Sequence, residues 1–384
     1  MVKVLKHIAL VVAGLGLLSC AAAPEHVEVN GHIVPCTKVS GIPGPVDLLV
    51  DRWHPSPRLL VSSYDRWGKA DEGEIYAIDL VTDTRSEPFA RIGEPPAGEP
   101  GHFAFRPDGI DLWKSPKGEI LLAVAVHGAD QGRHEAVVLY RVKGQTLQYV
   151  DAIRDHKWIV DPKDVAFAPD GKLYVTNFSE GGHSRWTYVF NRPPSTLVQC
   201  DPAKKERRCN VMARNIGGGN GVVVRNGVPM AASFYGGYLF DVDRSKIDGQ
   251  IFLRRFARVP YPDNMTLAHD QTILVASHAM PAVALHAQMK ANAPSAIYRL
   301  DPAADSPAPT LLFQDSGETI QAASSAVWYG KKLYLGQMFG DGVVVVPIPN
   351  TGLDDVLRCE RSGQVDTKSL VENSDGTTRS AATP

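Results

Sequence analysis

Short runs of alternating apolar and polar residues recur along most of the chain, separated by glycine, proline, aspartate and asparagine. Period-two alternation with β-branched and aromatic residues is typical of antiparallel β-strands. Repeats of roughly 40 to 60 residues built from short strands are typical of propeller blades. The sequence therefore predicts an all-β fold, a six-bladed β-propeller closed by a seam between its first and last strands. The six repeating units are VDLLVDRWHPSPRLLVSSYD, GIDLWKSPKGEILLAVAVHG, DVAFAPDGKLYVTNF, NGVVVRNGVPMAASFYGG, DNMTLAHDQTILVASHAM and SSAVWYGKKLYLGQMFGDG.

The two ends of the chain differ from the repeats. The first twenty residues combine two lysines with a short apolar segment and end in a lipobox-like Leu-Leu-Ser-Cys, which predicts an export signal lipidated at Cys20. Plain cleavage just after this segment is the alternative. We therefore expect an exported bacterial protein, periplasmic or in the cell envelope, that meets a membrane only through a lipid anchor. The expected segments are the signal 1–20, a short linker 21–35, the propeller 36–360 and a flexible tail 361–384.

Four cysteines remain after Cys20, an even number that favours two disulfides in an oxidising compartment. Three pairings are formally possible, and free buried thiols are the alternative. Cys200 and Cys209 flank a polar hairpin tip, while Cys36 and Cys359 lie near the two ends of the propeller region. Their positions favour one local bridge and one terminal clasp, and the clasp would hold the first and last strands together.

Composition and charge narrow the possible functions. The 384 residues are 44% hydrophobic and 21% charged, which is ordinary for a globular protein. The net charge of -2 provides no basic field for phosphates, so we expect no nucleic-acid partner. The chain also lacks a Gly-x-Ser-x-Gly elbow, a His-Glu-x-x-His motif and a Walker loop.

Radial repetition places the first residues of the inner strands around one axis. Carboxylate, amide and carbonyl oxygens gathered there would suit Ca²⁺, whereas Cys and His spacings typical of zinc are absent. The alternative is that aspartate and asparagine only cap turns before strands. The residues expected to converge are Val46, Asp47, Asp108, Gly109, Ile110, Lys163, Asp164, Asn220, Asp263, Asn264, Ser324 and Ser325.

Several stretches resemble, in order, the landmarks of the paraoxonase and arylesterase family, within the wider gluconolactonase-like group of six-bladed propellers. The resemblance spans Cys36 to Cys359 and depends on order, spacing and the terminal cysteine pair. It implies one structural and one catalytic calcium ion in a central tunnel, and hydrolysis of lactones and esters. The matching stretches are CTKVSGIPGPVDL, RPDGIDL, LLAVAVHG, DPKDVAFAPDGKLYVTN, GGNGVVV, DNMTLAHDQTILVASH and SSAVWYGKKLYLG.

The resemblance assigns the structural ion to the carboxylates of Asp47 and Asp164 and the backbone carbonyl of Ile110, all of which match. Three residues also match around the catalytic ion, but two ligands of that ion differ. The matching residues are Asn220, Asp263 and Asn264.

The two departures are Val46, where the family has a glutamate, and Lys163, where it has an asparagine. Valine supplies no carboxylate, and a protonated lysine has three donors and no acceptor. We therefore expect one structural Ca²⁺ and a weak or missing second ion. The Lys163 ammonium would take the vacated place, neutralised by Asp263, with Asp108 or Asp164 as further partners.

The histidines of the family site also change. Asp108 replaces the first histidine, His127 matches the second only with a one-residue shift, and His278 matches a further tunnel histidine. Either remaining histidine would act near neutral pH, or be an ordinary hydrogen-bonded strand residue.

Two functions follow from these residues. The first is a lactonase or arylesterase in which Lys163, Asn220 and Asn264 polarise the carbonyl and His278 or a carboxylate activates water. The second is a non-catalytic exported propeller that binds a small molecule or a protein partner. A new catalytic Lys163 would be strained or shifted in pKa, whereas a filler would be fully paired.

Overall fold

The computed structural model describes residues 31–66, 72–97, 99, 101–127, 135–180, 194–205, 208–244, 251–278, 292–349 and 356–360. The described residues from His32 onward belong to one compact unit. The expected signal 1–20, Cys20, most of the linker and the tail 361–384 lie outside the described residues. In the described ranges every regular element is a strand, and the strands form six sheets.

The first half of the described region contributes three of these sheets. One contains β3 (Pro45–Asp51), β4 (Arg58–Ser63) and β5 (Glu74–Asp79). The next, in spatial order, contains β6 (Ala90–Ile92), β10 (Thr146–Ile153), β9 (Ala136–Lys143), β8 (Ile120–Val126) and β7 (Pro107–Lys114). The third contains β11 (Pro162–Phe167), β12 (Leu173–Asn177), β13 (Thr196–Cys200) and β14 (Cys209–Arg214).

The second half contributes the other three sheets of the described region. One contains β15 (Gly219–Arg225), β16 (Val228–Ser233), β17 (Tyr238–Arg244) and β18 (Ile251–Ala257). Another contains β1 (His32–Val34), β26 (Leu357–Cys359), β22 (Thr310–Asp315), β21 (Ser295–Leu300), β20 (Ile273–Ser277) and β19 (Pro262–Leu267). The last contains β2 (Thr37–Pro43), β25 (Asp341–Pro347), β24 (Lys332–Phe339) and β23 (Gln321–Tyr329).

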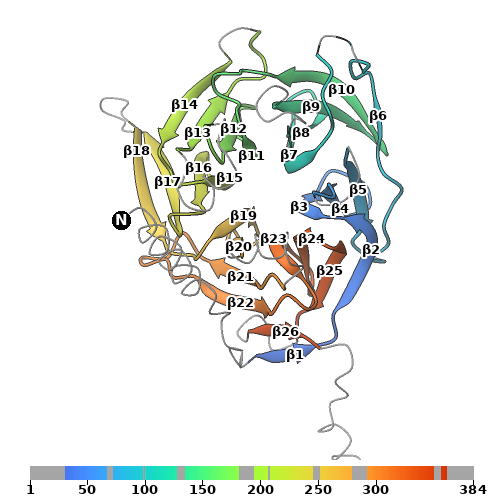
Figure 1. The fold of residues 1–384 in the computed structure, drawn as a ribbon, viewed down its shortest axis with the longest axis vertical. Coiled ribbons are helices and arrows are strands. Elements are labelled where there is room, and N and C mark those ends of the chain that lie inside the picture. Colours follow the sequence, from blue (N-terminus) through green and yellow to red (C-terminus); the bar gives the residue numbers. More distant parts are fainter. Residues whose placement is uncertain are drawn as a thin grey trace, which may run out of the picture. The chain divides into compact units, whose positions relative to one another are not determined.

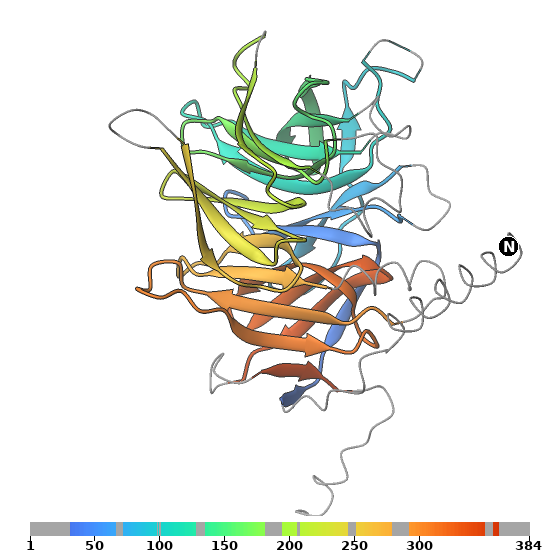
Figure 2. The same ribbon diagram turned by 60° about the vertical axis from the view of Figure 1, so that its left-hand side comes forward.

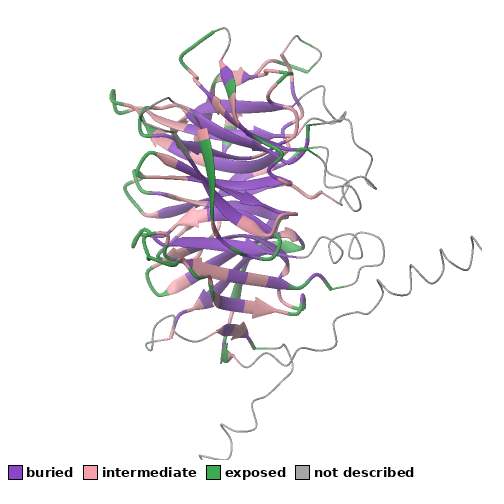
Figure 3. Ribbon diagram, turned by 90° about the vertical axis from the view of Figure 1, so that its left-hand side faces the viewer, coloured by how far each residue is buried: buried purple, intermediate pink, exposed green. Residues whose placement is uncertain are grey.

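The six sheets are arranged around a common centre, which confirms the prediction of an all-β propeller (Figure 1). Their innermost strands are β3, β7, β11, β15, β19 and β23, and Figure 2 shows the same sheets from another side. Apolar residues of neighbouring sheets pack face to face, as Leu60 of β4 does in one cluster with Val124 of β8. Figure 3 shows the buried residues along the strands and the exposed residues mainly in the loops. The core therefore lies between sheets.

The N-terminal strands join sheets built from C-terminal strands. β2 pairs with β25 in antiparallel orientation, and β1 pairs with β26 in parallel orientation. A disulfide joins Cys36 to Cys359, and a second joins Cys200 of β13 to Cys209 of β14. Both predicted pairings are confirmed, and such bridges are typical of extracellular or periplasmic proteins.

Two glycines allow inner strands to approach closely. A Cβ atom on Gly109 would lie 2.2 Å from the Asp164 Oδ1 atom, and one on Gly221 would lie 2.6 Å from the Asp263 carbonyl oxygen. Only a residue without a side chain fits at these positions. The close approach brings the polar starts of β7, β11, β15 and β19 together.

Candidate functional site

A β-bulge near the start of each inner strand re-aims the residues at the centre. The register of all six inner strands shifts at this point, between the pairs Pro45 and Asp47, Pro107 and Ile110, Pro162 and Asp164, Gly219 and Val222, Pro262 and Met265, and Ala323 and Ser325. Four of the shifts begin at a proline, which supplies no ladder hydrogen. Bulges bend strands and redirect side chains, so consecutive residues of one strand serve two different cavities.

The larger cavity has a volume of about 530 Å³ and is lined by all six inner strands. Asp47, Ile110 and Asp164 all line it, as expected for members of one site. The Asp47 carboxylate accepts hydrogen bonds from the amides of Leu48 and Ile110, at 2.9 and 2.8 Å. Asp164 repeats the pattern two sheets further on, since its carboxylate accepts from the amides of Val165 and Val222.

Burial makes ionisation of both carboxylates costly. Burial, together with the charges of Asp108 and Asp111, raises the pKa of Asp47 to about 7. Burial and the charge of Asp47 raise the pKa of Asp164 well above its usual range. Two buried carboxylates that line one cavity either keep a proton or are neutralised by a cation. In the described residues no group of three or more His, Cys, Asp or Glu side chains is arranged to hold a metal, so a cation here would rely on two carboxylates and on backbone carbonyl oxygen.

The smaller cavity, of about 210 Å³, has Lys163 and Asp108 in its wall. The Lys163 ammonium lies 3.0 Å from Asp108 Oδ2, and Arg66 lies 2.8 Å from Asp108 Oδ1. His127 Nε2 lies 2.7 Å from the same Oδ2. Three cationic side chains thus surround one buried carboxylate, and the sequence analysis had identified neither Arg66 nor the central role of Asp108. The full lining is Val46, Arg66, Asp108, Asp161, Lys163, Phe178, Asn220, Phe234, Asp263, His278 and Met338.

The predicted first partner of Lys163 was wrong. The ion pair of the ammonium is made with Asp108, and Asp263 instead contacts His278, whose Nδ1 lies 3.3 Å away. The physical reason is that Asp108 also contacts two further cations. Burial alone would raise the pKa of Asp108, but Arg66, Lys163 and His127 together hold that pKa well below its usual range. The ionised carboxylate attracts the ammonium.

Asp263 and His278 are both uncharged near neutral pH. Burial and the charge of Asp108 raise the pKa of Asp263 to about 8. Burial lowers the pKa of His278 to about 4, against the effect of its contact with the Ala323 carbonyl. His278 Nδ1 lies 2.9 Å from that carbonyl oxygen, so this nitrogen carries the hydrogen and Nε2 carries the lone pair.

His127 behaves in the opposite way. Burial and Lys163 would lower its pKa, but its contacts with Asp108 and Glu135 raise the pKa to about 9. His127 Nδ1 lies 3.4 Å from Glu135 and 3.8 Å from Asp161. An imidazolium is therefore held between three carboxylates, which is more than an ordinary strand hydrogen bond.

Other predicted residues also reach the smaller cavity. Asn220 is buried, and its Oδ1 has no hydrogen-bond partner in the described residues. The Val46 backbone carbonyl accepts from the Ser324 hydroxyl at 2.6 Å and lies 3.5 Å from Asn264 Nδ2. The buried valine side chain supplies no ligand. Ser324 and Asn264 therefore link β23 and β19 to β3.

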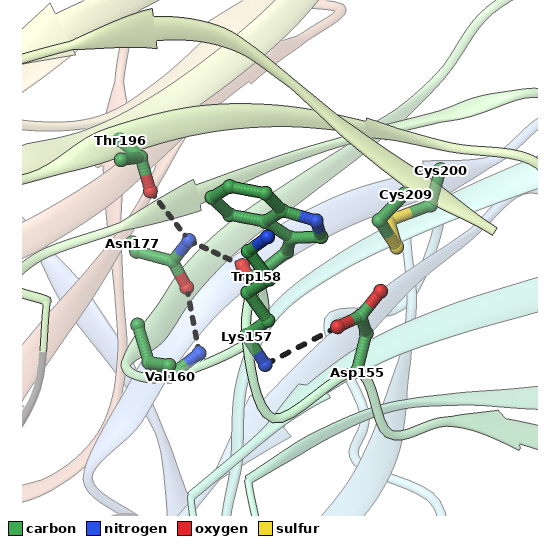
Figure 4. The surroundings of a disulfide bond; sticks show 8 residues. All are labelled: Asp155, Lys157, Trp158, Val160, Asn177, Thr196, Cys200 and Cys209. Carbon is green, nitrogen blue, oxygen red and sulfur yellow. Dashed lines mark hydrogen bonds between the residues drawn. A yellow bond between two sulfur atoms is a disulfide. The ribbon is translucent and has the colours of Figure 1, made fainter. Parts of the chain in front are cut away.

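Asn177 at the end of β12 holds the loop that leads to Lys163 (Figure 4). Its Nδ2 donates to the Trp158 carbonyl and to Thr196 Oγ1, both at 2.8 Å. Its Oδ1 accepts from the amides of Val160 and Asp161. Asn177 is fully buried, and the Cys200–Cys209 bridge lies nearby in the same view.

Ring-bearing residues follow the second strand of five sheets, and the sequence identified only two of them as site residues, the histidines His127 and His278. Each is the residue directly after the last residue of β4, β8, β12, β16 or β20. The prediction of the central residues considered only the first strand of each repeat, so it did not include this position. Radial repetition would have identified them. They are Tyr64, His127, Phe178, Phe234 and His278.

These features define a β-propeller with a charged central cavity. No family model and no curated protein matches the sequence. An aldose sugar dehydrogenase from Streptomyces coelicolor, in a PQQ-bound form, is 15% identical with a TM-score of 0.50, covering 82% of this chain and 98% of that chain. A candidate gluconolactonase, 13% identical with a TM-score of 0.48, covers 88% of this chain and 98% of its own. A luciferin-regenerating enzyme is 13% identical with a TM-score of 0.49, covering 86% of this chain and 100% of that chain.

The likeness to the dehydrogenase extends to the fold alone, because so low an identity carries no information about chemistry. The described part of the chain contains no helix with the length and apolar character needed to traverse a bilayer.

Proposed function

We propose that this chain is an exported, paraoxonase-like propeller that hydrolyses small lactones or aryl esters. In this proposal the six sheets are six blades, closed by the pairing of β2 with β25 and clasped by Cys36 and Cys359. The observation that carries the proposal is the smaller cavity, where the paired cation Lys163 lies in one wall with the uncharged residues His278 and Asp263.

Charge balance in that cavity favours an uncharged substrate. Its lining carries two cations, Arg66 and Lys163, and two carboxylates, Asp108 and Asp161, while Asp263 is mostly protonated at neutral pH. A charged ligand would disturb this balance in a buried setting, at a cost in desolvation. A lactone or ester brings a polar carbonyl without a net charge.

The residues suit attack of water on such a carbonyl. The Lys163 ammonium and the amide group of Asn220, which both line the cavity, would donate to the carbonyl oxygen as it gains charge. His278 Nε2 carries the lone pair that would accept a proton from water. A base with a pKa near 4 is weak, so the reaction favours esters whose leaving group needs no protonation.

The Asp47 and Asp164 carboxylates and the Ile110 carbonyl would hold one structural Ca²⁺. The donor set fits, because two buried carboxylates with raised pKa values gain most from a divalent, oxygen-preferring cation. The ion would supply charge neutralisation and rigidity to the starts of β3, β7 and β11. We propose that the second, catalytic ion of the family is not held, because Val46 and Lys163 supply no ligand there.

The second candidate function is a binding propeller. The pairing of Lys163 with Asp108 favours it, since a fully paired lysine behaves as a filler of a lost metal position. In this case Arg66, Lys163 and Asn220 would hold a small polar molecule without turning it over.

Turnover separates the two functions. Native protein incubated with a panel of lactones and aryl esters should hydrolyse at least one member above the rate of buffer, without added calcium beyond the structural ion. Activity must disappear in Lys163→Met and persist in the matched control Lys172→Met, because Lys172 pairs with Asp170 on the surface. Absence of hydrolysis of every member of the panel contradicts the enzyme proposal and leaves the binding function.

A further inference from the structure

One wall of the smaller cavity is aromatic. Phe178 and Phe234 both line the cavity and are almost fully buried. Their ring centroids lie 5.7 Å apart, and Phe234 lies 5.6 Å from the His278 ring. The Lys163 ammonium lies 5.8 Å from the centroid of the Phe178 ring. The aromatic wall therefore begins beside the polar groups proposed to act on the carbonyl.

Tyr261 extends this wall towards solvent. Its ring centroid lies 5.5 Å from that of Phe234, and the residue remains 37% exposed. Tyr261 precedes β19, the strand that carries Asp263 and Asn264. A large aromatic side chain thus reaches from the molecular surface to the buried wall.

The backbone of Tyr261 is strained. Its φ of 43° lies in the left-handed region, which bulky residues rarely adopt and which glycine or asparagine would occupy more easily. Such strain persists where the surroundings demand it, and it clusters at functional sites. Most of the non-glycine residues with positive φ in the described chain are small or polar, such as Asp83 and Asn226. Because a bulky residue is unfavourable in this backbone conformation, we infer that the Tyr261 ring itself has a function.

We propose that Phe178, Phe234 and Tyr261 form a subsite for a flat aromatic ring, with Tyr261 as the residue that selects aromatic over saturated substrates. This inference deepens the proposed function, because within the two substrate classes it assigns the chain to aryl esters. An aryl group placed on this wall has its ester carbonyl within the neighbourhood of Lys163 and His278. Offset or edge-to-face packing of the ring against Phe178 and Phe234 supplies the selectivity.

The test measures binding, so that it does not depend on turnover. Acetanilide and N-cyclohexylacetamide carry the same amide and differ only in an aromatic against a saturated ring, and calorimetry gives a Kd for each. We expect native protein to bind acetanilide about fivefold more tightly, the size of effect that ring packing provides. Tyr261→Leu should reduce the preference to within about twofold, and Tyr261→Phe should retain it.

Two further variants keep the result interpretable. Tyr261→Asn removes the ring while accepting the left-handed backbone, so loss of preference in this variant cannot be blamed on misfolding. Tyr329→Leu, at the wall of the larger cavity, should leave the preference as in the native protein. Equal binding of the two amides by native protein, or equal weakening of both in Tyr261→Leu, overturns the subsite. Binding with the predicted preference but without hydrolysis of any ester would overturn only the proposed catalysis.

Discussion

The Lys163 ammonium lies 3.0 Å from Asp108, a carboxylate whose side chain is only 3% exposed. Asp108 also binds Arg66 and His127, so it is the centre of a buried charge cluster. In the proposed function, the protein cations of this cluster stand in place of the catalytic ion of the resembled family. Catalytic electrostatics would then depend on residues that the chain itself supplies.

Lys163→Met should abolish hydrolysis while changing stability little. Asp108 keeps two cationic partners in this variant, Arg66 and His127, so no buried carboxylate is left uncompensated. We expect a loss of kcat/KM of at least about a hundredfold, in the range for removal of one oxyanion donor. Initial rates on the best ester, together with thermal unfolding, measure both effects. A large fall in Tm with rates otherwise preserved would assign Lys163 a structural role.

Asp164→Ala should weaken both calcium binding and folding. The change removes one of two carboxylates proposed to hold the structural ion and also leaves the Val165 and Val222 amides without their acceptor. We expect a cost of several kcal/mol in the free energy of unfolding. Calorimetric unfolding in calcium and in chelator measures it, and metal analysis should find about one Ca²⁺ per native chain. An exposed matched control is Asp170→Ala. An unchanged Tm in both conditions would contradict the structural ion.

The strands and their common centre could be predicted from the sequence because alternation and turn residues are local signals. Val46, Asp47, Lys163 and Asp164 all lie at the starts of inner strands, as the repeats indicated. Radial repetition turns a position within each repeat into a place around the axis. This reasoning extends to any residue at an equivalent position in the repeat.

The partners within the site could not be predicted in the same way. Arg66 lies in a loop after β4, outside the repeating pattern, and its contact with Asp108 depends on how that loop folds. The choice of Asp108 over Asp263 as the partner of Lys163 depends on the summed charges around each carboxylate. The strain at Tyr261 leaves no mark in the order of residues. Such features arise from side-chain packing and from the combined electrostatic effect of many charged groups.

His127→Gln should flatten the pH dependence of stability. The folded pKa of about 9 exceeds the unfolded value near 6.5, so the proton on His127 stabilises the native state. That contribution is complete below about pH 6.5 and is lost as the pH rises through about 9. The charged groups facing the ring are Asp108, Glu135, Asp161 and Lys163. Denaturant unfolding between these pH values should show native protein losing on the order of 2 kcal/mol more than the variant. Parallel pH profiles would count against a buried imidazolium.

Removal of the two disulfides should have unequal effects. Cys36 and Cys359 are separated by 323 residues, whereas Cys200 and Cys209 are separated by 9. In the chain-entropy account the longer loop restricts the unfolded state by about 6 kcal/mol, against about 2.5 kcal/mol for the shorter loop. The double change Cys36→Ser and Cys359→Ser should therefore lower the unfolding free energy more than Cys200→Ser with Cys209→Ser. Denaturant titrations of the two variants decide this, and the reverse order would refute the role of the terminal clasp.

The double change Val46→Glu and Lys163→Asn should create a second calcium site. The new carboxylate and amide would join Asn220, Asp263 and Asn264, and loss of the ammonium removes a charge that repels a divalent ion. Asn220 Oδ1 is already buried without a partner in the described residues, so one ligand needs no rearrangement of bonds. Metal analysis should show occupancy rising from one ion per chain to two. The single change Lys163→Asn is the matched control and should leave one ion, because it restores no carboxylate at Val46. An occupancy of two in the native protein would mean that Lys163 turns away from the centre, and an occupancy of one in the double variant would mean that Lys163 does not stand in a former metal position.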